Sequence, residues 1–302
     1  MDVLERYEPL VEESEAFRAA CERPLPSVVR TNTIKADVRR ARAALDESDI
    51  GYESPGWQPG LLRLDTDRPG STWGSFQGWW HGQEEVSAIP APVLDPQPGE
   101  RVWAACGAPG SKASHLAALM DDSGTLVAND RNLGRLSALR FNLERLGVTC
   151  AAVPNRDARN FSMQPFEFEE FDRALVDAPC SCEGTIRKNP DALAGWSEGY
   201  LDSVSTLQRS ILERAIQATR EGGSVVYSTC TFAPEENEAV LDGVLESEDC
   251  RLVEFDLALD HHPGTTEWQG EEFDSSLRKA KRVYPHQNDT GGFFCARLEV
   301  GG

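Results

Sequence analysis

The 302-residue sequence has no run of 18 apolar residues, so no segment is expected to span a membrane. Its first residues, Met1–Arg6, are charged and do not form the apolar core of a signal peptide. These absences predict a cytoplasmic protein with no membrane partner.

A disulfide framework is also missing, because the eight cysteines are widely scattered in a long chain. Cys180 and Cys182 are separated by only one residue, and no second Cys/His pair with zinc-finger spacing accompanies them. The sequence therefore predicts no metal site.

Lysine is scarce: only five of the 30 basic residues are Lys, against 50 acidic residues and a net charge of −20. Such acidity normally argues against nucleic-acid binding. Acidic, Lys-poor surfaces are also typical of proteins from salt-loaded cytosols, and at about 1 M salt the Debye length is roughly 3 Å. We therefore predict a halophilic protein, for which the net charge does not exclude RNA.

Residues 1–85 are predicted to form a small α/β domain and a connecting segment. Val28–Ile34 has the composition of a strand, and Asp37 is placed to cap a helix over Val38–Leu45. Gly and Pro punctuate residues 51–82, which also hold four of the seven Trp.

Residues 86–302 alternate between apolar strands and amphipathic helices, which predicts an α/β fold with an open, doubly wound, mostly parallel sheet. In such a sheet, ligands bind at the C-terminal ends of the strands. The expected strands cover 101–105, 125–130, 150–153, 173–177, 223–228 and 292–298, and the expected helices 112–120, 132–146, 200–220 and 235–245.

The first three strands of this part end in features that suit an adenosyl cofactor. The loop Ala105–Lys112 is rich in small residues, yet its spacing is neither that of a P-loop nor that of a dinucleotide-binding motif. Asp130 ends the second strand, where it could accept hydrogen bonds from ribose hydroxyls. Asp157 follows the third, where it could accept one from an adenine amino group.

Two cysteines, Cys180 and Cys230, each follow a short apolar run typical of a buried parallel strand. Two thiols at the ends of strands of one sheet can face one pocket. One thiolate can then attack a poor electrophile, and the second group can help to release it. Taken alone, a buried, inert cysteine is the more common outcome for each, but the motifs around the two cysteines favour a shared pocket.

Five motifs occur in the order of one known family: Ala108–Lys112, Asn129–Arg131, Asp177–Ser181, Tyr227–Thr231, and Pro285-His286 with Gly292–Phe294. Residues 76–298 thereby resemble the Sun (Fmu/Nop) family of S-adenosylmethionine-dependent RNA cytosine-5 methyltransferases, in its compact archaeal form. Residues 30–35 resemble more loosely the small RNA-recognition-like domain of that family. The resemblance implies a Rossmann-like methyltransferase domain over 86–302, with S-adenosylmethionine held by Ala108, Pro109, Gly110, Ser111, Lys112, Asp130, Arg135, Asp157 and Asp177.

The chain departs from the family pattern at several positions. Ala104 stands where Asp is usual, Ser111 where Gly is usual, and Cys182 where Gly is usual. The contexts of both catalytic cysteines are intact, so the resemblance implies an active enzyme.

The resemblance also assigns roles to four residues. Cys230 attacks carbon 6 of cytosine, and Cys180 assists loss of the carbon-5 proton and release of the enzyme. Asp177 hydrogen-bonds the cytosine ring nitrogen or amino group, and Lys112 contacts the target nucleotide.

Clusters of basic residues suggest phosphate contacts, although solvated helix faces would look the same. The residues assigned to RNA are Arg30, Lys35, Arg187, Lys188 and His286.

The sequence thus predicts a monomeric enzyme acting on RNA, with tRNA as first choice and ribosomal RNA second. A DNA cytosine methyltransferase uses a Pro-Cys nucleophile and lacks the Ser-Thr-Cys block around Cys230, which argues against that class. A non-catalytic RNA-binding or assembly factor with the same fold is the remaining alternative.

Overall fold

The computed structural model describes residues 3–164 and 166–301. Met1 and Asp2, at the start of the predicted first domain, and Gly302, at the end of the second, lie outside the described residues. In the part of the chain that is described, no helix is both long and apolar enough to cross a membrane.

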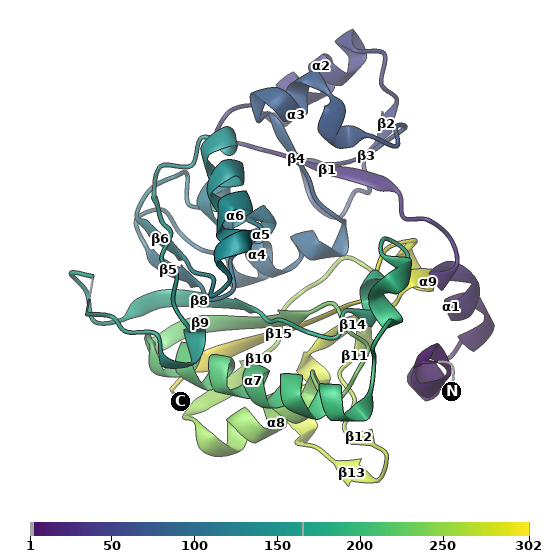
Figure 1. The fold of residues 1–302 in the computed structure, drawn as a ribbon, viewed down its shortest axis with the longest axis vertical. Coiled ribbons are helices and arrows are strands. Elements are labelled where there is room, and N and C mark those ends of the chain that lie inside the picture. The colour runs from purple at the N-terminus through teal and green to yellow at the C-terminus, as the bar shows by residue number, and fades with distance from the viewer. Residues whose placement is uncertain (1–2, 165, 302) are drawn as a thin grey trace.

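A four-stranded antiparallel sheet with the order β2-β3-β1-β4 forms the upper part of the molecule (Figure 1). Its strands are β1 (Ser27–Thr31), β2 (Tyr52–Glu53), β3 (Leu61–Leu64) and β4 (Trp80–Gly82). The sheet carries α2 (Val38–Glu47), α3 (Trp73–Gln77) and the 3-10 turn η2 (Pro69–Ser71). Asp37 caps α2 as predicted, because its carboxylate accepts a hydrogen bond of 2.7 Å from the Arg40 N–H.

The first helices of the chain pack away from this small sheet. The 3-10 helix η1 (Val3–Leu10) and α1 (Ser14–Cys21) place Tyr7 and Phe17 against Phe232, with ring centroids 5.8 and 5.2 Å apart. Hence residues 3–21 contribute to the larger part of the molecule, while residues 27–82 build the small sheet. The domain boundary near residue 85 stays a prediction.

The larger sheet has nine strands in the order β11-β14-β15-β9-β8-β5-β6-β7, with β10 paired to β15. Five of them run parallel, as the sequence predicted: β5 (Arg101–Ala104), β6 (Thr125–Ala128), β7 (Ala151–Ala152), β8 (Phe171–Asp177) and β9 (Thr219–Thr229). Every one of the five is followed by a loop at the same edge of the sheet, so the C-terminal ends converge there.

Helices cover both faces of this sheet, which makes it doubly wound (Figure 1). One face holds α4 (Pro90–Leu94), α5 (Ser111–Leu119) and α6 (Leu133–Leu146), and the other holds α7 (Glu198–Gln217) and α8 (Glu238–Ser247). Helix α6 begins where the Asn132 side chain accepts from the Gly134 N–H at 2.9 Å, and it ends at Gly147, whose φ of +79° suits glycine.

The predicted last strand is β15 (Phe293–Val300), which is antiparallel to β9. The sequence did not predict the strands β10 (Cys250–Val253), β11 (His262–Pro263) and β14 (Lys281–Val283) that extend the sheet beyond it. These strands are short and partly polar. The hairpin β12–β13 (Glu267–Trp268, Glu271–Glu272) and the short helices η3 (Val86–Ala88), η4 (Ala158–Asn160), η5 (Glu183–Thr185), η6 (Pro190–Leu193), η7 (Ser275–Lys279) and α9 (Pro285–Asn288) complete the described elements.

Candidate active site

A cavity of about 480 Å³ lies at the C-terminal ends of the parallel strands. It brings together the loop after β5, both acids that follow β6 and β7, and the cysteine loops that follow β8 and β9. Among its lining residues are Lys112, Asp130, Arg135, Asp157, Asp177, Cys180 and Cys230.

The loop after β5 packs against the end of β6. A Cβ at Gly107 would stand 3.4 Å from the Ala128 Cα and from the Asn129 carbonyl oxygen, so the two backbones lie close together there. The Arg135 guanidinium donates a hydrogen bond to the Ala108 carbonyl oxygen and holds the loop against α6. Ser111, one of the departures from the family pattern, forms a 2.9 Å hydrogen bond with His81 of β4.

Asp130 is the acid best suited to hold a ribose. Only 3% of its surface is exposed, and its Oδ1 accepts a 2.8 Å hydrogen bond from the Asn132 N–H. Its Oδ2 accepts no hydrogen bond from the described residues, although Arg135 stands 3.5 Å away. A buried acceptor with free capacity, beside a cavity and a small-residue loop, fits the hydroxyl donors of an adenosyl group.

Asp157 lines the same cavity but is already paired. Its carboxylate contacts the Arg159 guanidinium at 2.6 Å. The hydrogen bond from Arg159 lowers the pKa of Asp157, so the group remains an anionic acceptor at neutral pH.

Replacing Asp130 by Ala should weaken S-adenosylmethionine binding by about 10- to 100-fold, because a charged acceptor that hydrogen-bonds the ligand is lost. Isothermal calorimetry measures the dissociation constant directly. The matched control is Asp67→Ala, which removes an exposed carboxylate between β3 and η2, outside the residues that line the cavity. Equal affinities for the two variants would remove Asp130 from the site.

Three thiols meet on the floor of the cavity. The Sγ atoms of Cys180 and Cys230 are 3.3 Å apart, and those of Cys180 and Cys182 are 3.7 Å apart. All three are free thiols on half-buried residues. The sequence predicted that Cys180 and Cys230 would face one pocket, and the structure brings them together.

The three thiols titrate as a unit because they share hydrogen bonds. Hydrogen bonds with Cys182 and Cys230 raise the pKa of Cys180. The hydrogen bond from Cys180 lowers the pKa of Cys230, but contact with Cys182 and burial outweigh it and raise that pKa. Cys180 therefore supplies the interaction that favours the Cys230 thiolate.

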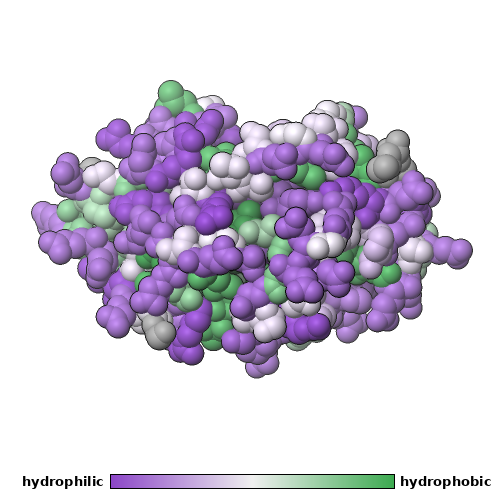
Figure 2. Space-filling view, turned by 90° about the horizontal axis from the view of Figure 1, so that it is seen from below, coloured by the Kyte–Doolittle hydropathy of each residue, from purple (hydrophilic) through white to green (hydrophobic). Residues whose placement is uncertain are grey.

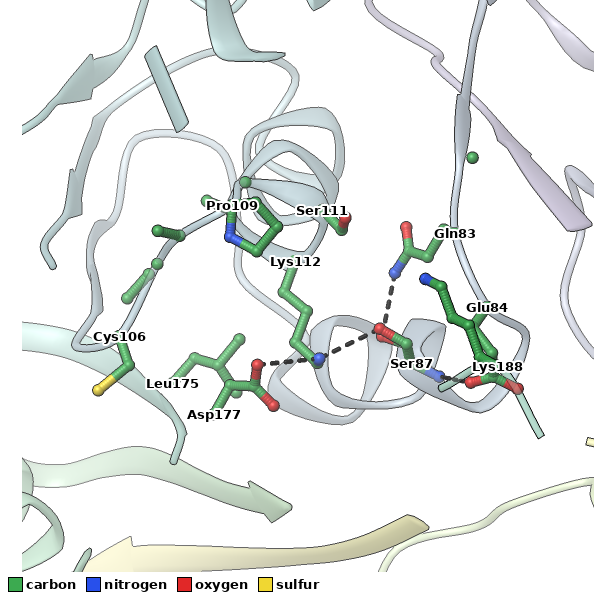
Figure 3. A pocket seen from close by; sticks show the side chains of 16 residues that line it. Gln83, Glu84, Ser87, Cys106, Pro109, Ser111, Lys112, Leu175, Asp177 and Lys188 are labelled. Carbon is green, nitrogen blue, oxygen red and sulfur yellow. Dashed lines mark hydrogen bonds and ion pairs between the residues drawn. The ribbon is translucent and has the colours of Figure 1, made fainter. Parts of the chain in front are cut away.

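Lys112, in the first turn of α5, lines the cavity of about 480 Å³ and also a second one of about 200 Å³, which is drawn in Figure 3. Ala108, Pro109, Gly110 and Ser111, which the sequence assigned to the cofactor, line this second cavity. The Lys112 Nζ lies 2.9 Å from the Asp177 carboxylate and donates a 3.1 Å hydrogen bond to Ser87 Oγ. Burial alone lowers the pKa of Lys112, but the charge of Asp177 reverses this and raises it. Asp177 also accepts a 3.1 Å hydrogen bond from Ser228, its partner in the β8–β9 register. The lysine is thus a permanent cation that fixes Asp177.

Two buried glutamates tie the cysteine loops together, and the sequence analysis assigned them no role. Glu236 accepts hydrogen bonds from the Ser181 N–H at 3.0 Å and from Gln208 at 2.7 Å. Glu183 accepts from Tyr7 at 2.9 Å and from Trp196 at 2.8 Å. These bonds fix the loop that follows Cys180, so the thiols are positioned before any substrate arrives.

Burial raises the pKa of Glu236 to about 7, from 4.5 for the unfolded chain. The folded protein therefore holds a proton that the unfolded chain releases between these values. Its stabilising effect is complete below pH 4.5 and is lost as the pH rises through 7. The Glu236→Gln variant lacks the titrating carboxyl group. Between pH 5 and 8 the melting temperature of the wild type should therefore fall by a few °C more than that of the variant. Parallel pH profiles in thermal unfolding would contradict this assignment.

Two of the predicted RNA contacts are corrected by their burial. Arg30 is 2% exposed and donates to Gln83 at 2.8 Å and to Ser114 at 2.9 Å, so it links β1 to the cofactor-side helix α5. Arg187 is 7% exposed and donates to the carbonyl oxygens of residues 23, 24 and 290 and to Asp289. With their N–H groups used internally, neither guanidinium can bind a phosphate as predicted.

The other three predicted RNA residues are more accessible. Lys188 is exposed and lines the cavity shown in Figure 3, beside Glu84. Lys35 is exposed, but its Nζ donates to the Arg145 carbonyl oxygen at 2.7 Å. His286 is half-buried, with its ring 6.1 Å from that of Phe17. Their phosphate contacts stay predictions, and Lys188 is the best placed.

The doubly wound sheet with a cavity at its strand ends defines a Rossmann-like fold, here with three thiols in the cavity. Residues 91–299 match the family described as 16S rRNA methyltransferase RsmB/F. The chain is 36% identical over 299 residues to the tRNA (cytosine(49)-C(5))-methyltransferase of Pyrococcus abyssi, covering 98% of this chain and 94% of that protein. It therefore belongs to this family of RNA methyltransferases, which confirms the resemblance noted in the sequence.

Two further comparisons agree. The 25S rRNA (cytosine-C(5))-methyltransferase nop2 of Schizosaccharomyces pombe is 37% identical over 96% of this chain, which spans only 48% of that relative. A crystal structure of a methyltransferase homolog protein from Pyrococcus horikoshii superimposes with a TM-score of 0.86 at 32% identity, covering 98% of this chain and 93% of that one. The fold predicted from the alternating pattern is thereby confirmed.

Proposed function

We propose that this protein methylates carbon 5 of a cytosine in RNA, with S-adenosylmethionine as methyl donor and tRNA as substrate. One observation carries the proposal: two thiols at the ends of neighbouring parallel strands lie 3.3 Å apart in a cavity that Cys106 and Lys112 of the small-residue loop and Asp130 also line. A protein that only binds RNA would not require two thiols in contact at this place, whereas covalent attack on a base requires a thiol there.

Cytosine carbon 5 is a poor nucleophile, and a thiolate added at carbon 6 turns the ring into an enamine that can accept a methyl group. Cys230 performs the attack, with its Sγ 3.3 Å from that of Cys180. S-adenosylmethionine, when bound, supplies the methyl group from its sulfonium. Cys180 then assists loss of the carbon-5 proton, and the electron pair of that C–H bond re-forms the ring double bond as the bond from carbon 6 to Cys230 breaks and releases the product.

Asp177 and Lys112 hold the base during these steps. Asp177, fixed by Lys112 and Ser228, accepts a hydrogen bond from the cytosine edge and favours the protonated ring. Lys112 balances the charge of Asp177 and faces the cavity lined also by Lys188. The target base must leave its stack, so an unpaired or flexible cytosine suits the site.

The choice of tRNA rests on one relative, the tRNA methyltransferase of Pyrococcus abyssi, which this sequence matches over 94% of that protein at 36% identity. Bisulfite mapping of total RNA from cells with and without the protein tests this. A 5-methylcytosine in tRNA that depends on the protein supports the proposal. If the protein-dependent 5-methylcytosine lies in ribosomal RNA, the proposed substrate is wrong and ribosomal RNA takes its place.

The domain limits also belong to this proposal, with residues 1–85 as the RNA-recognition-like part and 86–302 as the catalytic part. The buried hydrogen bond from Arg30 to Ser114 and the partly buried one between His81 and Ser111 join the small sheet to α5 and support a fixed arrangement of the two. We further propose a monomer in the cytoplasm. A purely RNA-binding assembly factor would show no methyl transfer to bulk RNA.

Salt should raise activity and stability toward molar KCl if the protein is halophilic. The net charge of −20 is self-repulsive at low ionic strength, and the face shown in Figure 2 is covered mainly by hydrophilic residues. At about 1 M salt the repulsion from RNA is screened within roughly 3 Å. The test is to measure the melting temperature and the initial rate of methyl transfer from about 0.1 to about 3 M KCl, with the RNA concentration kept constant. Best activity below about 0.2 M would contradict it.

A further inference from the structure

We propose that Cys180, Cys182 and Cys230 form a binding site for a thiophilic divalent metal ion, Zn²⁺ in the first instance, which reversibly switches the enzyme off. The three Sγ atoms all lie within 4.8 Å of one another. Zinc–sulfur bonds of about 2.3 Å at tetrahedral angles place sulfur atoms about 3.8 Å apart. The observed separations of 3.3 and 3.7 Å need little adjustment to reach that value.

Cys182 turns a pair of thiols into a three-ligand site. Its backbone has a φ of +68°, in the left-handed region that favours glycine and is strained for other residues. In this conformation its side chain lies against the preceding residues of its own loop, and its Sγ donates to the Cys180 carbonyl oxygen at 3.2 Å. The mechanism proposed above assigns no task to this thiol.

The ligands are held in place by backbone contacts on both loops. Ser181, between the two cysteines of the first loop, donates its N–H to Glu236 at 3.0 Å. The Cys230 carbonyl oxygen accepts a 2.9 Å hydrogen bond from the Gly184 N–H, which joins the second loop to the first. Preorganised sulfur ligands lose little freedom when they bind a metal.

An ion can reach the cluster through the cavity. The three cysteines are half-buried and line the space of about 480 Å³. With three protein ligands, the fourth tetrahedral position is open to water, as in sites that exchange their ligands. Thiolate ligands select Zn²⁺ over hard ions such as Mg²⁺ and Ca²⁺.

Binding would proceed without electron transfer. Three S–H bonds give their protons to the buffer, and three metal–sulfur bonds form. Because Cys230 and Cys180 would then be ligands, neither could attack the base or take its proton. The inhibitory part of this inference rests on the proposed function, whereas metal binding itself does not.

Cobalt(II) serves as a spectroscopic probe of the purified full chain, kept reduced with a phosphine. We expect one Co²⁺ per chain, with sulfur-to-metal charge transfer in the near ultraviolet and the visible bands of a tetrahedral site, and displacement by Zn²⁺. Cys182→Gly should bind about 100-fold more weakly, since one of three ligands is lost. This variant relieves the strained φ and should stay folded. The control Cys250→Ala changes a cysteine of β10, outside the cluster.

Methyl transfer gives the second readout. One equivalent of Zn²⁺ should reduce the rate of the wild type by about tenfold or more, a chelator should restore it, and Cys182→Gly should resist the metal. Absence of stoichiometric Co²⁺ binding, or equal binding by Cys182→Gly, would overturn the site. Binding with undiminished transfer would overturn the switch. Binding by a protein that transfers no methyl even without metal would refute the proposed function and leave the site standing.

Discussion

Cys230→Ala should abolish both methyl transfer and covalent attachment to RNA, while Cys180→Ala should trap the protein on its RNA. Without Cys230 no sulfur can add to carbon 6, so the rate falls by roughly 10⁴-fold or more. Without Cys180 the attack and the methyl transfer still occur. The carbon-5 proton is then removed slowly, and elimination of Cys230 stalls.

The trapped species is a protein–RNA adduct that survives a denaturing gel, and its methyl group comes from labelled S-adenosylmethionine. Cys250→Ala, outside the thiol cluster, controls for loss of a cysteine as such and should leave the rate unchanged. An adduct in Cys230→Ala but none in Cys180→Ala would reverse the two roles and bring the chemistry closer to that of DNA-type enzymes.

Asp177→Asn should lower the rate of methyl transfer by about 10²- to 10³-fold, because a carboxylate aimed at the protonated ring is replaced by a neutral amide. The side chain keeps its size, so the contacts to Lys112 and Ser228 can persist and the fold should hold. Single-turnover kinetics with saturating cofactor isolate this step from binding.

Asp202→Asn, an exposed position on α7, is the matched control and should behave as wild type. If Asp177→Asn weakens cofactor affinity as strongly as it slows transfer, Asp177 serves S-adenosylmethionine binding and not the base. A variant with full activity would exclude Asp177 from both roles.

The parallel core of the fold could be predicted because each of its elements carries a local signal. Buried strands appear as short apolar runs, and α6 is bounded by Asn132 and Gly147, which the structure shows as its two caps. The antiparallel strands β10, β11 and β14 could not be predicted in this way. They are two to four residues long and are stabilised mainly by pairing within the sheet.

The cavity could be predicted for the same reason: parallel strands bring their C-terminal ends to one edge, whatever separates them in sequence. The burial of two arginine side chains could not be predicted from the sequence. Arg30 and Arg187 looked like phosphate ligands because Arg is usually exposed, yet both satisfy their N–H groups inside the protein. The contact of Cys182 with Cys180 depends on one left-handed residue, which only the backbone reveals.

The most direct measurement is nucleoside mass spectrometry of RNA treated with the purified protein and isotopically labelled S-adenosylmethionine. The RNA comes from cells that lack the protein, so that its target sites are unmodified. The account predicts labelled 5-methylcytidine with the wild type and none with Cys230→Ala. Label in any other nucleoside, or no label in RNA at molar or low salt, would contradict it.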